Sequence, residues 1–203
     1  MRSRHFDLRR PAAVLLATLA AGCATDDQIR DAITDVNQEF RAAYEQILVE
    51  KGSRTYRVTP KAAFAATTVV MQRLGMRVSD QAPELGYLNV FAAAPAPLSA
   101  REWRQAGRAD LPKLREIAMQ HVGPLGYFIK FEPEGLETVI NATALEVSAG
   151  TEISFTVRLR EVAPPKSGYP RREYLPPTAV RMGLDKIWAE LNRELGAAWI
   201  INP

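Results

Sequence analysis

Cysteine and histidine are scarce in this chain of 203 residues, which contains one cysteine and two histidines. A single cysteine excludes an internal disulfide and any metal site built from several cysteines. The sequence also lacks the short motifs GxxxxGK[ST], GxGxxG, HExxH and GxSxG, which mark nucleotide sites, zinc proteases and serine hydrolases. We therefore expect no enzymatic activity, no metal and no cofactor-binding residue.

Long hydrophobic runs are missing as well. The longest uncharged apolar stretch, Pro11–Ala21, has about eleven residues, whereas a membrane-spanning helix needs ~20. The composition, 47% hydrophobic and 24% charged, is that of an ordinary globular protein. A polytopic membrane protein and a disordered chain are both excluded.

The positive charge is confined to the beginning of the chain. The net charge is +3, from 26 basic and 23 acidic residues, and residues 1–22 alone hold four arginines and one aspartate. The remaining 181 residues therefore carry 22 basic and 22 acidic side chains. This balance gives no reason to expect a nucleic-acid partner.

The first 23 residues have the layout of an export signal. Four arginines precede the apolar stretch, and Gly22 and Cys23 follow it. A basic segment, a short apolar segment and small residues at the end are typical of a secretory signal peptide. Cleavage after Ala21 or Ala24 would leave Cys23 without a role, and this is the simpler interpretation.

The segment Leu19-Ala20-Ala21-Gly22-Cys23 resembles the lipobox of bacterial lipoproteins, with Ala20 where that family usually has leucine. The resemblance implies removal of residues 1–22 as a lipoprotein signal peptide. It also implies a thioether-linked diacylglycerol and an N-acyl chain on Cys23. Ala24, rather than aspartate, after the cysteine implies delivery to the periplasmic face of the outer membrane. Membrane lipid is then a partner through the Cys23 anchor.

An amphipathic helix is predicted directly after the cysteine, within residues 23–52. Thr25 and Gln28 fit a capping box, and Gly52 follows the last turn. Apolar residues then recur at 4-3-4-3-4 spacing: Ile29, Ile33, Val36, Phe40, Ala43 and Ile47. This seam either packs on the protein's own body or forms a short coiled coil or docking helix.

The remainder, residues 53–203, is predicted to be one α+β globular domain, a two-layer structure with a mainly antiparallel sheet and helices on one face. This domain is preceded by the N-terminal stalk helix. We expect strands at 55–58, 76–79, 87–93, 125–131, 137–148 and 151–162, of which the last alternates strictly between apolar and polar residues. Helices are expected from Pro60 to Leu74, over 99–122 with breaks near Gly107 and Pro112, and over 180–195. A proline-rich loop occupies 163–177.

The lipobox followed by a small α+β body resembles the small outer-membrane lipoproteins of Gram-negative bacteria. The fragments Pro60–Phe64 and Leu74–Met76, followed by Asp80 and Gly86, are similar to the opening of several of them. The body loosely resembles the helix-grip domains of the C component of the β-barrel assembly machinery, and no binding residue is carried over.

Candidate sites in the body are few. His121 is the one histidine after the signal segment and is expected to lie near a helix end. Four carboxylates in predicted turns, Asp80, Glu84, Glu132 and Glu134, are the residues that a cell-envelope hydrolase would need to bring together.

Two surface features are candidates for partner contact. The loop that follows residue 163 interleaves prolines with Tyr169, Arg171, Arg172 and Tyr174, and arginine and tyrosine are favoured at interfaces. Trp103 lies between charged residues and is either an interface anchor or one side of a helix that touches its own sheet.

Together these features predict a membrane-anchored periplasmic lipoprotein with a non-enzymatic structural, scaffolding or envelope-assembly accessory role, and an envelope protein as its partner. The first alternative is a binding module for a small apolar ligand or lipid, with a cavity between Trp188 and the strand over 153–159. The second is a cell-envelope hydrolase.

Overall fold

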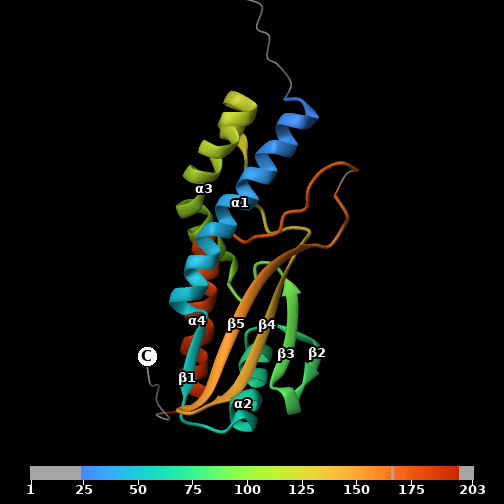
Figure 1. Ribbon diagram of the computed structural model, residues 1–203. Coiled ribbons are helices and arrows are strands. Elements are labelled where there is room, and N and C mark those ends of the chain that lie inside the picture. Colours follow the sequence, from blue (N-terminus) through green and yellow to red (C-terminus); the bar gives the residue numbers. More distant parts are fainter. Residues whose placement is uncertain (1–23, 166, 197–203) are drawn as a thin grey trace, which may run out of the picture.

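The computed structural model describes residues 24–165 and 167–196 as a five-stranded sheet with helices packed on it (Figure 1). The elements are α1 (Asp26–Lys51), β1 (Ser53–Tyr56), α2 (Pro60–Arg73), β2 (Arg77–Ala82), the 3-10 turn η1 (Pro83–Leu85), β3 (Tyr87–Ala93), α3 (Ala100–Val122), the 3-10 turn η2 (Gly123–Phe128), β4 (Leu136–Val147), β5 (Gly150–Glu161) and α4 (Pro177–Glu194). The strand order is β1-β5-β4-β3-β2, and every pair is antiparallel. The predicted α+β class is confirmed.

The sheet is built around the long β4–β5 hairpin, whose twelve-residue strands pair from Leu136–Glu161 to Val147–Gly150. On β5, Ile153, Phe155 and Val157 are buried, and the residues between them are partly exposed. This alternation places one face of the sheet against the helices and leaves the other accessible. The accessible face carries hydrogen-bonded polar side chains, those of Tyr87, Asn89, Asn141 and Thr156.

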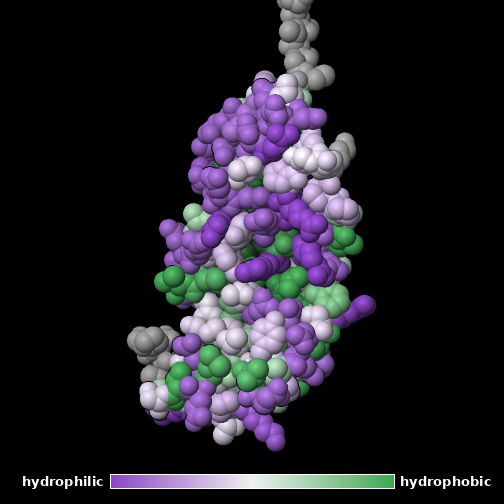
Figure 2. Space-filling view, turned by 45° about the vertical axis from the view of Figure 1, so that its right-hand side comes forward, coloured by the Kyte–Doolittle hydropathy of each residue, from purple (hydrophilic) through white to green (hydrophobic). Residues whose placement is uncertain are grey.

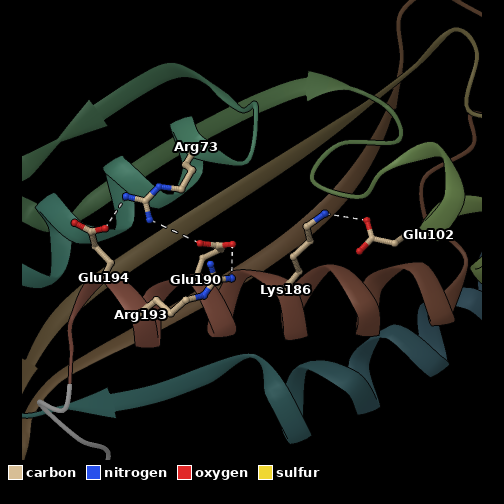
Figure 3. A network of polar contacts seen from close by, with 6 residues as sticks. All are labelled: Arg73, Glu102, Lys186, Glu190, Arg193 and Glu194. Carbon is tan, nitrogen blue, oxygen red and sulfur yellow. Dashed lines mark hydrogen bonds and ion pairs between the residues drawn. The ribbon is translucent and has the colours of Figure 1, made fainter.

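Helices α2 and α4 cover the buried face. The Trp188 ring of α4 is 1% exposed and lies 4.8 Å from Phe155 and 6.3 Å from Tyr56, centroid to centroid. At the edge of this interface Arg73 of α2 pairs with Glu194 at 2.7 Å and Glu190 at 3.7 Å (Figure 3). The ion pairs border a closed apolar core.

The starts of α3 and α4 are capped in different ways. In α3 the Ser99 hydroxyl and the Glu102 carboxylate form a capping box. Helix α4 starts after Pro176 without a cap of its own. There the carboxylate of Asp110, from α3, accepts hydrogen bonds from the Thr178 N–H at 2.9 Å and hydroxyl at 2.6 Å. Because the first N–H groups of a helix lack intrahelical partners, Asp110 caps α4 from another helix.

Helix α1 begins with the predicted capping box of Thr25 and Gln28 and runs for 26 residues. Its C-terminal half belongs to the core, since Phe40 and Ile47 are each 3% exposed and Tyr44 is 8% exposed. The C-terminal part of the seam therefore packs within the protein, where α1 contacts α3 and α4, and the helix is integrated into the body.

Helix α3 is continuous, so the predicted breaks near Gly107 and Pro112 are wrong. Proline within a helix removes a hydrogen bond and costs ~3 kcal/mol or more. Burial on both sides of Pro112 offsets this cost, because the buried residues Trp103, Ala106, Leu114 and Ile117 keep helical spacing across the proline.

The strand predicted over 125–131 is also wrong, because residues 123–128 form η2. Gly123 has a positive φ of 58°, which turns the chain sharply at the end of α3. Gly126 then lies so close to α3 that a Cβ there would be 2.6 Å from the Met119 nitrogen. This backbone contact holds the segment against the helix rather than in the sheet.

Candidate functional site

An apolar groove opens at the end of the molecule where α1 begins. It has a volume of about 370 Å³ and lies between α1, the C-terminal half of α3, the segment that follows η2 and part of the loop before α4. The lining residues are Ala24, Ile29, Ala32, Ile33, Val36, Asn37, Leu114, Ala118, Val122, Leu125, Ile129, Lys130, Phe131, Arg172 and Tyr174. Its volume falls within the ~300–1,000 Å³ of small-molecule sites.

The groove lining is mainly apolar. Ala32, Leu114 and Ala118 are buried, with at most 6% exposure, and they are groove-lining residues that α1 and α3 contribute. Ile29 and Ile33 are only half-buried. Polar groups enter the lining at Asn37, Lys130 and Arg172. An arrangement of this kind suits an apolar ligand with few directional contacts.

The loop after β5 forms one wall of this groove, and we call its described residues 167–176 the strap. Asn37 ties it to α1 twice: its Nδ2 donates to the Arg171 carbonyl at 2.8 Å, and its Oδ1 accepts from the Glu173 N–H at 3.3 Å. Arg30 Nε donates to the Gly168 carbonyl at 2.7 Å. The strap is therefore held along the N-terminal half of α1.

A polar contact joins the two helices that line the groove. His121 Nε2, near the end of α3, lies 2.7 Å from Asp35 Oδ2 of α1. The predicted place of His121 near a helix end is confirmed. Its contact with Asp35 joins the two helices that form the groove, and together with the strap it fixes the separation of the walls.

Exposed apolar side chains gather beside the groove on η2. Leu125 is 47% exposed, Tyr127 59% and Phe128 74%. The Arg115 guanidinium lies 4.5 Å from the Tyr127 ring centroid, a cation–π distance. The close contact of Gly126 with α3 fixes the backbone between these residues, so their exposure results from a tightly held turn.

The exterior around this end is polar on the side shown in Figure 2. There the hydrophobic residues form small separate patches, and the upper end of the molecule is covered mainly by hydrophilic residues. On this side the exterior is thus largely polar, in contrast to the apolar lining of the groove.

The residues predicted for partner contact are mostly engaged within the chain. Tyr169 donates a hydrogen bond to Asp26, which raises the pKa of Tyr169. Arg172 Nε pairs with Glu161 at 2.8 Å, and the Tyr174 ring lies 5.6 Å from that of Tyr44. Arg171 is exposed, and its carbonyl is held by Asn37.

Trp103 and Cys23 are the remaining predicted site residues. Trp103 is 5% exposed and lies 5.8 Å from Phe131, ring to ring. This burial assigns Trp103 to the core and leaves no surface for a partner. Cys23, the predicted lipidation site, lies outside the described residues, and the groove-lining Ala24 directly follows it.

The cavity expected between Trp188 and β5 is not present among the described residues. Trp188 packs directly on Phe155. A space lined by Ile140, Val157 and Ile187 on the same face has only about 10 Å³. The prediction placed an apolar site at the wrong end, because the large side chains of α4 fill this interface.

The four carboxylates proposed for hydrolysis do not converge. Glu84 lies near the Val147 end of β4, since Gly86, two residues further along the chain, accepts a hydrogen bond from the Ala144 N–H. Glu132 and Glu134 precede its other end, at Leu136. Eight strand residues span about 26 Å, whereas catalytic carboxylates lie within roughly 10 Å.

Across 24–165 and 167–196, no group of three or more metal-ligating side chains is gathered in one place. Within the same ranges no helix has the length and apolar character required to cross a membrane.

Sequence reasoning missed both the groove and an arginine row on α3. Arg101, Arg104 and Arg108 border one shallow depression, and within the described part of the chain none of them forms an ion pair. Their spacing of three and four places them on one helix face, a signal that was present in the sequence. The groove had no comparable local signal.

Comparison of the chain with protein-family models, curated proteins and solved structures gave no match.

Proposed function

We propose that this protein is a lipid-anchored lipoprotein at the periplasmic face of the outer membrane, with a non-enzymatic structural or assembly-accessory role in the cell envelope. The observation that carries this proposal is the sequence Leu19–Cys23 at the end of the export signal. The chain's one cysteine occupies the position at which the lipobox resemblance requires a cysteine.

The geometry of α1 supports an anchor at this point. The helix begins at Asp26, with its cap at Thr25, so only Ala24 separates Cys23 from the cap. An acylated cysteine there would hold the groove and the exposed η2 residues close to the bilayer surface. Since two acyl chains already anchor a protein stably, a diacylglycerol together with an N-acyl chain would do so without a transmembrane helix.

The arginine row supports a protein partner with acidic character. Arg101, Arg104 and Arg108 occupy one exposed face of α3, where opposite charge on a partner would steer association. The strap residues are less suited to this role because they are bonded to α1 and β5. This part of the proposal replaces the partner surface expected from sequence.

The anchor is tested by growing cells with an alkyne analogue of palmitate and comparing the wild-type protein with Cys23→Ala. We expect label and membrane association for wild type, and complete loss of both for the variant. Ala24→Ser, which keeps the cysteine and a small following residue, is the matched control and should retain the label. Unchanged labelling and fractionation of Cys23→Ala would overturn the proposal.

A second candidate function, binding of an apolar ligand or lipid, is favoured by the groove. Its volume and apolar lining meet the requirements of a ligand site. This function and the anchor are compatible, since both concern the same end of the molecule.

A further inference from the structure

The groove ends at the residue that follows the proposed lipidation site. Ala24 lies at one end of the lining and Asn37 at the other end along α1. Any acyl chain attached to Cys23 therefore starts next to the groove. From this arrangement we propose that one acyl chain of the Cys23 lipid lies in the groove, an inference that rests on the proposed lipidation.

The dimensions of the groove fit one acyl chain. The stretch from Ala24 to Asn37 spans roughly 20 Å at about 1.5 Å per residue. The hydrocarbon core of a bilayer is ~30 Å thick, so a chain confined to one leaflet reaches about 15 Å. The volume of about 370 Å³ is that of a narrow site rather than one for a whole phospholipid.

The energetics favour occupation by a tethered chain. Moving an acyl chain from a bilayer into an apolar groove changes its own surroundings little, because lipid tails and aliphatic side chains are similarly apolar. The gain comes from the groove, whose half-buried residues such as Ile29, Ile33 and Val36 are removed from water. Because the acyl chain is attached to the residue next to the groove, its effective concentration at the groove is high.

The surroundings distinguish a single chain from a membrane surface as the occupant. The exterior of this end is mainly hydrophilic on the side shown in Figure 2. Asp26 and Asp27 of the first turn, and Asp31 one turn later, are exposed beside the groove, and carboxylates do not favour contact with anionic headgroups. Apart from the exposed η2 side chains, this end thus offers little apolar surface to a flat bilayer, whereas the groove can admit a single chain.

Withdrawal of one chain leaves the anchor intact. A lipid with three acyl chains, as the lipobox resemblance implies, keeps two in the membrane, and two chains suffice for stable anchoring. The third chain, held between α1 and α3, fixes the orientation of the folded body relative to the bilayer.

The test uses the full-length protein from cells fed a diazirine analogue of palmitate. After irradiation the purified protein is digested and the crosslinked peptides are identified by mass spectrometry. We expect peptides from residues 24–37 or 114–131 joined to the lipidated Cys23 peptide. The same peptides carrying a phospholipid would overturn the proposal, as would a lipidated Cys23 without any crosslink to the groove.

Failure of the proposed function gives a different result. Cys23 would then carry no lipid mass at all, and both proposals fall.

A variant in the groove lining tests the positive result further. Ile33→Glu places a carboxylate in the lining and should lower the groove crosslinks about tenfold while the lipid on Cys23 remains. Val49→Glu, at a position of the same helix that is 90% exposed, should leave them unchanged. The wild-type map decides the proposal even if Ile33→Glu folds poorly, which circular dichroism will show.

Discussion

Two regions of the molecule are built in different ways. We call them the sheet layer, which comprises β1–β5 with α2 and α4, and the groove end. The groove end comprises the N-terminal half of α1, the C-terminal half of α3, η2 and the strap. In the sheet layer large apolar side chains such as Trp188 and Phe155 fill the interior and are at most 2% exposed. At the groove end Ile29 and Ile33 remain half-buried, and Asn37, Arg30 and His121 hold the walls. Close packing stabilises the first region, while polar ties maintain an open apolar space in the second.

The largest expected effect concerns the sheet layer. Trp188→Ala should lower the free energy of unfolding by about 3–5 kcal/mol, because it removes a buried ring and leaves a cavity. Ile33→Ala, at the groove end, should cost about 1 kcal/mol, since the side chain is only partly buried. Urea unfolding of both variants in the Cys23→Ala background measures the difference. Equal losses would mean that the groove end is packed as tightly as the sheet layer.

A smaller effect is expected for the strap. Asn37→Ala removes both hydrogen bonds that this side chain makes with the strap backbone and should cost about 1 kcal/mol. The strap should then open locally, and trypsin should cleave after Arg171 faster than in wild type. Gln38→Ala, at an exposed neighbouring position, is the control. An unchanged cleavage rate for Asn37→Ala would show that other contacts hold the strap.

The smallest effect is expected for the ion pair that joins α3 to α4. The hydrogen bond from Lys186, followed by that from the Ser99 N–H, lowers the pKa of Glu102 from 4.5 to about 2 (Figure 3). Because the folded-state pKa is the lower one, this contribution to stability is present above pH 4.5 and is lost as the pH falls to about 2.

Glu102→Gln should therefore reduce stability by up to about 1 kcal/mol at pH 7 and by almost nothing near pH 2. Thermal unfolding at the two pH values measures this change. Glu116→Gln is the control. The Glu116 carboxylate is exposed, and its ion pair with Lys113 of the same helix is long, at 3.7 Å. A loss of the same size at both pH values would contradict the assignment.

Local signals in the sequence were sufficient for much of the fold. The alternation over 151–162 predicted β5, and Thr59 with Pro60 marked the start of α2. Thr25 and Gln28 did the same for α1. Each of these features depends on residues within about one turn or one strand of each other, so a contiguous segment contains the whole signal.

The errors came from contacts with residues outside the segment whose pattern was interpreted. The pattern over 125–131 suits a strand, but Gly126 packs against Met119 of α3 and keeps this segment out of the sheet. The loop residues Tyr169 and Arg172 have the composition of an interface, yet they bond to Asp26 and Glu161. Composition cannot reveal such partners, which lie 143 and 11 residues away in the chain, respectively.

The sequence by itself determined the α+β class, most of the strands and helices, and the place of the one cysteine, Cys23, shortly after the apolar stretch Pro11–Ala21. The tertiary structure decided where the apolar seam of α1 is buried and where it remains open. Phe40 and Ile47 are buried in the core. Ile29 and Ile33 instead line the open groove between α1, α3 and the strap. The physical reason is that periodicity fixes which face of a helix is apolar, while only the packing of distant segments determines how fully that face is covered.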